Sequence, residues 1–167
     1  MSIEVFDNFL NLEDSQAIYN SLLESNFPWY FNDGVAYGPE PELSFFQFTH
    51  MFFIDYNITS KYFNLIEPIL KKIEPSALLR IKANLNPYSS ERVTYPYHVD
   101  YNNFKGKTAI YYVNTNDGVT LFNDGTVVES IQNRFVIFDS NIFHSGTNCQ
   151  NQKARSLINF NYYESLN

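Results

Sequence analysis

Residues 135–160 read FVIFDSNIFHSGTNCQNQKARSLINF, and this stretch decides how the chain is expected to fold. It contains two apolar runs, 135–138 and 156–160, rich in the β-branched and aromatic residues that favour strands. A polar segment separates the runs. His144 lies in that segment, and Arg155 comes eleven residues later, just before the second run. The pattern predicts two strands of a β core with a histidine and an arginine near their ends.

More strands are expected on the N-terminal side of this stretch. Apolar and polar residues alternate over 79–86, which is typical of a half-buried strand. Asn123-Asp124-Gly125 predicts a hairpin, because Asp-Gly tolerates the positive φ of a primed turn. The other predicted strands cover 5–10, 45–54, 108–114, 119–122 and 127–128.

Two helices are expected in the N-terminal half. The first covers 12–25, with Asn11 as its N-cap. The second covers 60–73, where Pro68 must kink or split it. The fold class is therefore α+β and mainly β, with the helices packed on one sheet of a double-sheet core.

Composition narrows the class of protein. A chain of 167 residues with 44% hydrophobic residues fits one folded domain. Its net charge of −7 and few clustered cations disfavour nucleic acid as a partner. One cysteine indicates a reducing compartment, and no apolar run could span a membrane. We expect a cytoplasmic protein, in the host cytoplasm if the gene is viral. The oligomeric state cannot be predicted.

His98 and Asp100 form a His-Val-Asp motif at the end of a polar loop, 87–97. Side chains two positions apart in an extended segment point the same way, so both can reach one metal ion. With His144 they make two histidines and a carboxylate, a set that leaves coordination positions open. An exposed His98 and a structural His144 are the alternative, and a His-x-Asp motif alone would favour it. The order His, Asp, His, Arg favours the metal, because Arg155 can grip a carboxylate.

From about residue 80 to residue 164 the chain resembles the iron(II)- and 2-oxoglutarate-dependent oxygenases of the prolyl-hydroxylase type. The resemblance rests on the motif 98–100, on TAIYYVN at 108–114, on NRFVIFD at 133–139, on Phe143-His144 and on Arg155. It implies a double-stranded β-helix, or jelly roll, formed by one domain over 1–167.

The resemblance also implies roles for individual residues. His98, Asp100 and His144 would hold Fe(II), and Arg155 would pair with the distal carboxylate of the cosubstrate 2-oxoglutarate. O2 would be consumed, succinate and CO2 released and a substrate hydroxylated, with ascorbate as a candidate reductant. Tyr112 matches the position whose phenol binds the same distal carboxylate, although a core tyrosine is the alternative.

Four further positions bear on the cosubstrate pocket. Asn84 and Asn86 lie on the strand that reaches toward the cosubstrate in such enzymes, and a solvent-facing pair is the equal alternative. Many members have Arg-x-Ser, whereas this chain has Leu157 at the serine position. The pocket must then be completed elsewhere, with Tyr112 or Thr108 as candidates.

The substrate is left open between a prolyl or other peptide side chain and a small molecule. Repair enzymes of alkylated bases carry a second arginine at the position of Asn161, so nucleic acid is disfavoured. The rival function is a cupin-like jelly-roll metal protein without oxygenase activity. His50 is expected to be structural rather than to line the pocket, and Cys149 to have no role. The loops 32–44 and 87–97 are expected to set substrate choice, while acidic Asp33, Glu40 and Glu42 are expected to be solvated.

Overall fold

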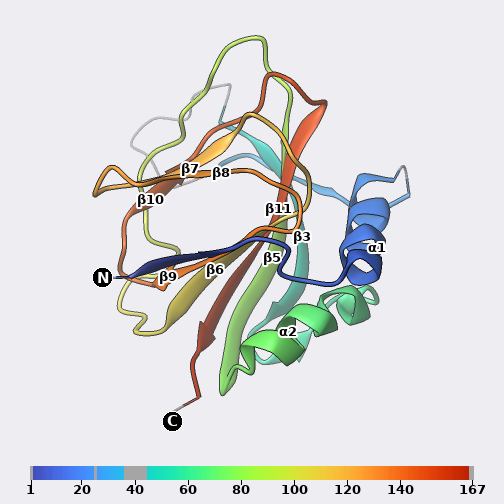
Figure 1. Ribbon diagram of the computed structural model, residues 1–167, viewed down its shortest axis with the longest axis vertical. Coiled ribbons are helices and arrows are strands. Elements are labelled where there is room, and N and C mark those ends of the chain that lie inside the picture. The colour runs from blue at the N-terminus through green and yellow to red at the C-terminus, as the bar shows by residue number, and fades with distance from the viewer. Residues whose placement is uncertain (1, 25, 36–44, 166–167) are drawn as a thin grey trace.

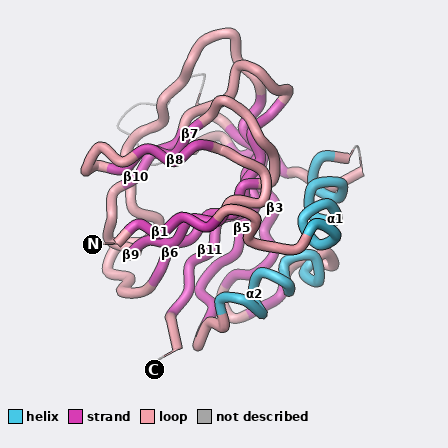
Figure 2. The backbone as a smooth tube through the Cα atoms, viewed as in Figure 1, coloured by secondary structure: helices cyan, strands magenta, loops and turns pink. Residues whose placement is uncertain are grey.

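Strands dominate the described parts of the chain, which are residues 2–24, 26–35 and 45–165 of a computed structural model (Figures 1 and 2). The strands are β1 Ile3–Phe6, β2 Tyr30–Asn32, β3 Gln47–Ile54, β4 Asn57–Ile58, β5 Ala77–Pro87, β6 Lys107–Tyr112, β7 Val119–Phe122, β8 Val127–Glu129, β9 Phe135–Asp139, β10 His144–Gly146 and β11 Ala154–Tyr163. An eight-stranded antiparallel sheet has the order β1-β9-β6-β11-β5-β3-β2, with β4 beside β3. A three-stranded sheet has the order β10-β7-β8. The expected mainly β chain with two sheets is confirmed.

Strand β11 is the central strand of the large sheet and is buried along almost its whole length. Its side chains alternate between the two faces of the sheet. Ile158 and Phe160 belong to the core cluster that includes the helices, and Leu157 belongs to a second cluster on the other face. Arg155 and Asn159 share the face of Leu157 and line a cavity. Arg155 and Asn159 therefore point away from the helices.

Helices cover one face of the large sheet (Figure 1). Helix α1, Leu12–Leu23, begins as expected, because the Asn11 side chain accepts a hydrogen bond from the backbone N–H of Asp14 at 2.8 Å. Pro68 splits the second helix into a 3-10 turn, Phe63–Ile66, and helix α2, Glu67–Ile73, with the proline in the first turn of α2. The buried residues of these helices that pack into the core are Ile18, Leu22, Ile66 and Ile69.

The hairpin of β7 and β8 forms where it was expected, but its turn is of another type. Among the described residues of the loop, only Gly125 has a positive φ, at 90°. The N–H of Gly125 donates to the carbonyl of Phe122, and the N–H of Phe122 donates to the carbonyl of Thr126. This is a three-residue loop with glycine in the left-handed position, not a primed two-residue turn. Glycine is required at residue 125 alone.

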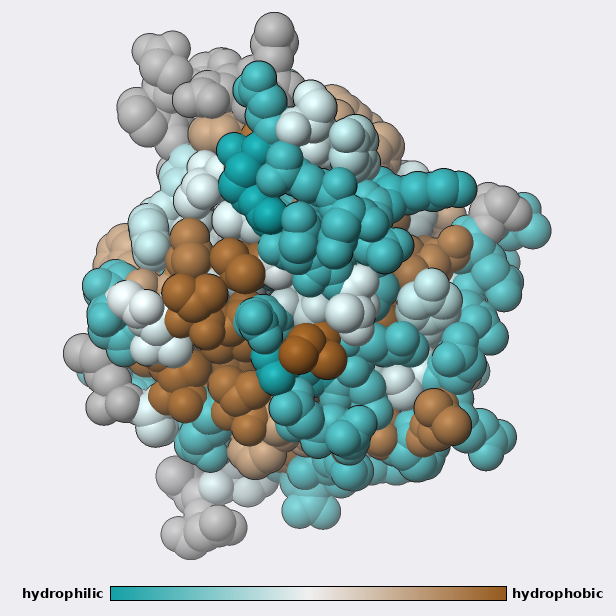
Figure 3. Space-filling model, turned by 45° about the horizontal axis from the view of Figure 1, so that its top comes forward, coloured by the Kyte–Doolittle hydropathy of each residue, from teal (hydrophilic) through white to brown (hydrophobic). Residues whose placement is uncertain are grey.

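Hydrophilic side chains cover most of the face drawn in Figure 3, where apolar side chains gather in one patch. The net charge of the chain is −7. None of the described helices has the length and apolar character needed to span a membrane. In this acidic chain, three positively charged side chains line one cavity, those of Arg80, Lys82 and Arg155.

Candidate metal centre and the cavity around it

A cavity of about 500 Å³ lies between the two sheets. Its wall on the large sheet comes from alternate residues of β5 and β11, and its opposite wall includes Thr120 of β7 and His144 of β10. Residues 32–35 and Phe45 also line it. The cavity has room for a ligand of a few heavy atoms as well as a metal ion.

The two histidines are brought together by the backbone. The N–H of His98 donates to the carbonyl of His144 at 2.9 Å, and the N–H of His144 donates back at 3.0 Å. Directly paired residues of this kind carry their side chains on one face. The imidazole centroids lie 4.7 Å apart. The pairing of these two residues across 46 positions of sequence could not be read from the motif.

Both imidazoles are oriented for a metal. Nδ1 of His98 lies 3.0 Å from the carbonyl of Pro96, and Nδ1 of His144 lies 3.2 Å from the carbonyl of Ile142. When Nδ1 carries the proton, Nε2 offers its lone pair to an ion. Burial is the main cause that lowers the pKa of His144, so this imidazole is neutral at pH 7.

Asp100 completes the set and is itself held by several groups. Its Oδ2 accepts hydrogen bonds from the side-chain amides of Asn159 at 3.0 Å and Asn161 at 2.7 Å. Its Oδ1 lies 3.3 Å from the guanidinium of Arg80. Burial alone would raise the pKa of Asp100, but Arg80, His144, Asn161 and His98 outweigh it and hold the pKa well below its usual value. The carboxylate is therefore charged and fixed.

The donor atoms of His98, Asp100 and His144 lie within 4.8 Å of one another. Two imidazoles and one carboxylate are the donor set of non-heme iron(II) sites with open positions. The three residues predicted as metal ligands are thus brought together in one cavity, and their chemistry fits such an ion.

Arg155 lies at the other end of β11 from Asn161 and is only 2% exposed. Its Nε donates to the Ser130 hydroxyl at 2.7 Å, and its terminal nitrogen donates to the Thr120 hydroxyl at 3.0 Å. Within the described residues no carboxylate lies within ion-pair distance of this guanidinium. A buried cation is costly without an anionic partner.

Two glycines make room for this arginine. A Cβ at Gly118 would lie 2.5 Å from Cδ of Arg155 and 2.8 Å from the carbonyl oxygen of Asn148. A Cβ at Gly146 would lie 3.1 Å from a terminal guanidinium nitrogen. The space around Arg155 is therefore closed on the protein side, and the cavity is the side left for a ligand.

Two amides beside Arg155 have unpaired atoms. Asn86 is the cross-strand neighbour of Arg155, and Asn84 is two residues earlier on the same face of β5. Oδ1 of Asn84 and Nδ2 of Asn86 are buried without a hydrogen-bond partner among the described residues. Both residues line the cavity, so the solvent-facing alternative for this pair is wrong. Unpaired buried polar atoms indicate a place for a polar ligand.

The candidates for completing the arginine pocket need correction. Thr108 pairs with Asn161, six residues along β11 from Arg155, and its hydroxyl accepts a hydrogen bond from Asn161 at 3.2 Å. It is therefore too distant to complete that pocket and supports the Asp100 end. Tyr112 is fully buried, and its phenol donates to Thr120 at 2.8 Å. The hydroxyl that faces both Arg155 and the cavity belongs to Thr120, which the sequence did not reveal.

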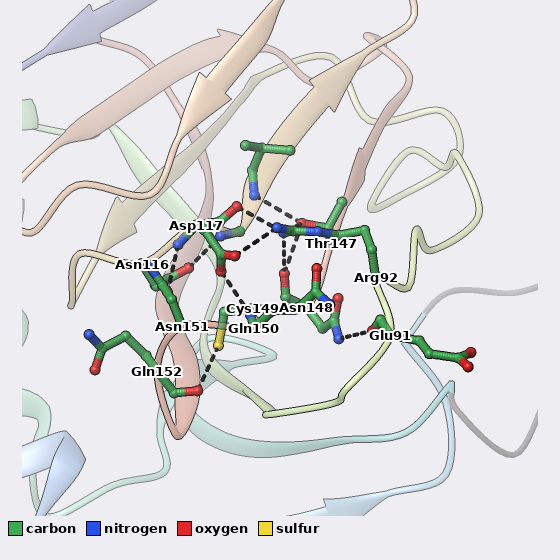
Figure 4. Close-up of polar contacts among 12 residues, drawn as sticks. Glu91, Arg92, Asn116, Asp117, Thr147, Asn148, Cys149, Gln150, Asn151 and Gln152 are labelled. Carbon is green, nitrogen blue, oxygen red and sulfur yellow. Dashed lines mark hydrogen bonds and ion pairs between the residues drawn. The ribbon is translucent and has the colours of Figure 1, made fainter.

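A polar network joins the segments around Asp117, Asn148 and Arg92 (Figure 4). The guanidinium of Arg92 forms an ion pair with Asp117 at 2.8 Å and also donates to the carbonyl of Asn148 at 3.1 Å. The Asn148 side chain in turn bonds the backbones of Glu91 and Val93. Residues 91–97, part of the loop 87–97 that was expected to set substrate choice, are therefore tied together with His98 to 144–148 beside the small sheet.

Other predicted positions have simpler outcomes. His50 is buried between the carbonyl of Pro28 and the hydroxyl of Ser60, which confirms a structural histidine. Cys149 is buried. Asp33 lines the rim of the cavity, while Glu40 and Glu42 lie outside the described residues, as does most of the loop 32–44. Arg80, Lys82, Asn159 and Asn161 were not recognised as part of the site from sequence.

No protein-family model and no curated protein sequence matches the chain. Solved structures do. One is a prolyl hydroxylase from Trichoplax adhaerens in complex with a peptide of hypoxia inducible factor, with a TM-score of 0.65 and 14% identity over 97% of this chain and 83% of that one. Another is a viral collagen prolyl hydroxylase from Paramecium Bursaria Chlorella virus-1, with a TM-score of 0.61 and 12% identity over 99% and 91% of the two chains.

The chain has the fold of the prolyl hydroxylases. A third structure widens this group: a 2-oxoglutarate/iron(II) oxygenase-family oxidoreductase from Burkholderia pseudomallei matches with a TM-score of 0.66 and 9% identity over 97% of this chain and 87% of that one. The resemblance noted in the sequence between residues 80 and 164 therefore extends, as a shared 2-oxoglutarate oxygenase fold, over nearly all of the chain.

Proposed function

We propose that this chain is an iron(II)- and 2-oxoglutarate-dependent dioxygenase that hydroxylates a substrate and releases succinate and CO2. Residues 1–167 would form a single oxygenase domain, and the two sheets would be the two sides of a double-stranded β-helix. His98, Asp100 and His144 would hold the iron. The fold shared with oxygenases and the donor set of the cavity support this proposal.

One observation carries the choice of cosubstrate. Arg155 is a buried cation without a carboxylate partner in the described chain, and it lines the same cavity as the His-Asp-His cluster. A metal-binding jelly roll without oxygenase activity, the rival function, has no use for a buried cation in that place. A dicarboxylate pairs with the arginine through one carboxylate and leaves the other for the metal end.

The residues of the chain do four things in this proposal. The hydrogen bonds of Pro96 and Ile142 orient the two imidazoles, and Arg80 with the two asparagines keeps Asp100 ionised and fixed. Arg155 binds the distal carboxylate. Leu157 and Ile110 supply an apolar wall that limits water in the cavity. The iron, when bound, supplies the redox chemistry with O2, and ascorbate is a candidate for keeping it reduced.

Thr120 takes the place of the missing Arg-x-Ser hydroxyl in this proposal. Its oxygen accepts from both Arg155 and Tyr112, which occupies its two acceptor positions. Its own proton is then left to donate into the cavity, toward a carboxylate held by Arg155. Tyr112 thus acts on the pocket through Thr120, and Asn86 supplies a further donor.

Two of the structures with the same fold are prolyl hydroxylases of peptide substrates by name, so a prolyl or other peptide substrate or a small molecule is proposed.

The test is succinate formation from 2-oxoglutarate with purified protein, iron(II), ascorbate and air. We expect slow turnover without added substrate in the wild type, and its loss in His144→Ala. His50→Asn is the matched control, because it removes a buried histidine that lies outside the cavity. Anaerobic binding of 2-oxoglutarate is measured in parallel. Absence of both turnover and binding in the wild type would favour the rival metal-binding jelly roll.

A further inference from the structure

Lys82 is a third cation in the cavity, beside Arg80 and Arg155. It lies on β5 between Arg80 and Asn84, on the face that lines the cavity, and it is the cross-strand neighbour of Asn159. Neighbouring strands are about 4.8 Å apart. Because Asn159 holds Asp100, the Lys82 side chain lies level with the metal-binding residues and one strand to their side.

The ammonium group of Lys82 makes no ion pair within the described parts of the chain. Arg80, by contrast, is fully engaged: it contacts Asp100, bonds the side chains of Asn159 and Asn161, and stacks on Tyr101 at 4.8 Å. Burial, and then the nearby Arg80, lower the pKa of Lys82 to about 8, while Asp100 raises it. A lysine held in such a place without a partner costs stability, which indicates a role with a ligand.

The position of Lys82 separates it from the expected path of the cosubstrate. Arg155, Leu157 and Asn159 follow one another on the cavity face of β11, so a line from Arg155 to Asp100 runs along this strand. Lys82 lies off this line, on the side of β3 and β2. The cavity wall on that side reaches residues 32–35. A molecule that enters beside the metal would meet Lys82 there.

Charge leads to the same conclusion. One carboxylate of the cosubstrate would neutralise Arg155, and the other, together with Asp100, would neutralise the metal and leave an excess of positive charge from Arg80 and Lys82. Asp33 is the remaining acidic group of the described cavity wall, and it is exposed at the rim. We propose that the substrate carries a carboxylate or phosphate group that binds Lys82 beside the metal. This inference rests on the proposed function, and it deepens it by naming the charge class of the substrate.

The test follows the Lys82 side chain directly by NMR of ¹³C-labelled lysine in the chain loaded with zinc(II), before and after saturation with 2-oxoglutarate. The Lys82 signal is assigned by its loss in Lys82→Met. Acetate and methyl phosphate are the anionic probes, and acetamide is the neutral probe of the same shape as acetate. We expect acetate and methyl phosphate to shift the Lys82 signal saturably in the chain that holds 2-oxoglutarate, and acetamide to leave it in place. Lys71, exposed on α2 across the sheet, is the internal control.

Other responses of Lys82 overturn the inference. A Lys82 signal that ignores the anions, or responds equally to acetamide, removes the anion site. Lys82 binds the cosubstrate instead of the substrate if 2-oxoglutarate itself shifts the Lys82 signal and prevents the shift by acetate. The same conclusion follows if Lys82→Met lowers the affinity for 2-oxoglutarate about tenfold. Failure of 2-oxoglutarate to bind the wild type would instead refute the proposed function, while the acetate titration without it would still report on Lys82.

Discussion

The two ends of the cavity differ in how completely the protein satisfies its own charges. At the Asp100 end, the carboxylate has an arginine and two amide donors within hydrogen-bond or ion-pair distance. At the Arg155 end, the cation has only two hydroxyl acceptors, and amide atoms of Asn84 and Asn86 have no partner in the described residues. Both ends are buried in the same cavity.

This difference shows which end is complete before a ligand arrives. Metal ligands must be held in place by surrounding groups, because an ion binds tightly only to donors that already converge. An end that binds a charged organic ligand instead keeps unpaired groups until that ligand is present, at a cost in stability. Changes at the two ends should therefore have opposite effects on stability and separate effects on binding.

Replacing Asp100 should have the largest effect. Asp100→Asn removes the charge that Arg80 and a metal would share, and it sets an amide against the amide donors of Asn159 and Asn161. We expect metal affinity to fall by at least about 100-fold, since even outer contacts of metal ligands are worth roughly 10- to 100-fold. Calorimetric titration with manganese(II) measures the affinity, and succinate formation should be lost.

The matched control for this change is Asp139→Asn. Asp139 pairs with Lys107 at 2.9 Å, and it is not among the residues that line the cavity of His98, Asp100 and His144. Its amide variant should bind manganese(II) like the wild type. If Asp100→Asn also kept wild-type affinity, the assignment of Asp100 as a metal ligand would be wrong.

Arg155→Met should separate the two ends. We expect affinity for 2-oxoglutarate to fall about 100-fold, because the charge-assisted pair with a carboxylate is lost, while manganese(II) affinity changes less than about twofold. The ligand-free variant should be as stable as the wild type or up to about 1 kcal/mol more stable, since a buried unpaired cation has been removed. Urea unfolding without ligand measures this. A loss of several kcal/mol would show that Arg155 is structural and would remove the contrast between the ends.

The sequence predicted the Asp100 end of the cavity better than the Arg155 end. The Asp100 end depends on the spacing of nearby residues, whereas the Arg155 end depends on the register between distant strands. His98 and Asp100 are two residues apart, so their common direction follows from an extended backbone. Thr108 was assigned to the arginine pocket because no sequence signal gives the register of β6 and β11, which places Thr108 opposite Asn161. Thr120 was missed for the same reason, because it reaches Arg155 from the other sheet.

The fold was predicted where turns and caps are marked by single residues. The cap at Asn11 and the split at Pro68 formed as expected, because a side-chain acceptor and a missing N–H act locally. The type of turn predicted at Gly125 was wrong. The backbone pairing of the two strands leaves three residues in the loop, and the length of the loop selects the turn type. Residues 91–97 were expected to belong to a loop because their anchors, Asp117 and Asn148, are distant in sequence.

Thr120→Val tests how the Arg155 end compensates for Leu157. The valine keeps the shape of the side chain and removes the hydroxyl that Arg155 and Tyr112 share. We expect 2-oxoglutarate affinity to fall about tenfold, in line with about 1 to 1.5 kcal/mol for one hydrogen bond. Exposed Thr126→Val should have no effect. Tyr112→Phe should cost less than Thr120→Val; an equal or larger cost would mean that the phenol itself contacts the carboxylate.

Lys82 extends the contrast to a group beside the metal end that makes no ion pair among the described residues. Its pKa is lowered from 10.5 to about 8 by burial and then by Arg80, against the opposing charge of Asp100. Between these two pH values the unfolded chain binds the proton more tightly than the folded chain does. The free energy of unfolding should therefore rise with pH from about 8 to 10.5 in the wild type relative to Lys82→Met, while below pH 8 the variant stays more stable by a constant amount. Denaturant unfolding of both proteins across this range measures the difference, in which the titration of tyrosines common to both cancels. If the difference in the free energy of unfolding between the two proteins did not depend on pH, Lys82 would be solvated in the folded chain. Unpaired buried groups would then occur only at the Arg155 end of the described cavity.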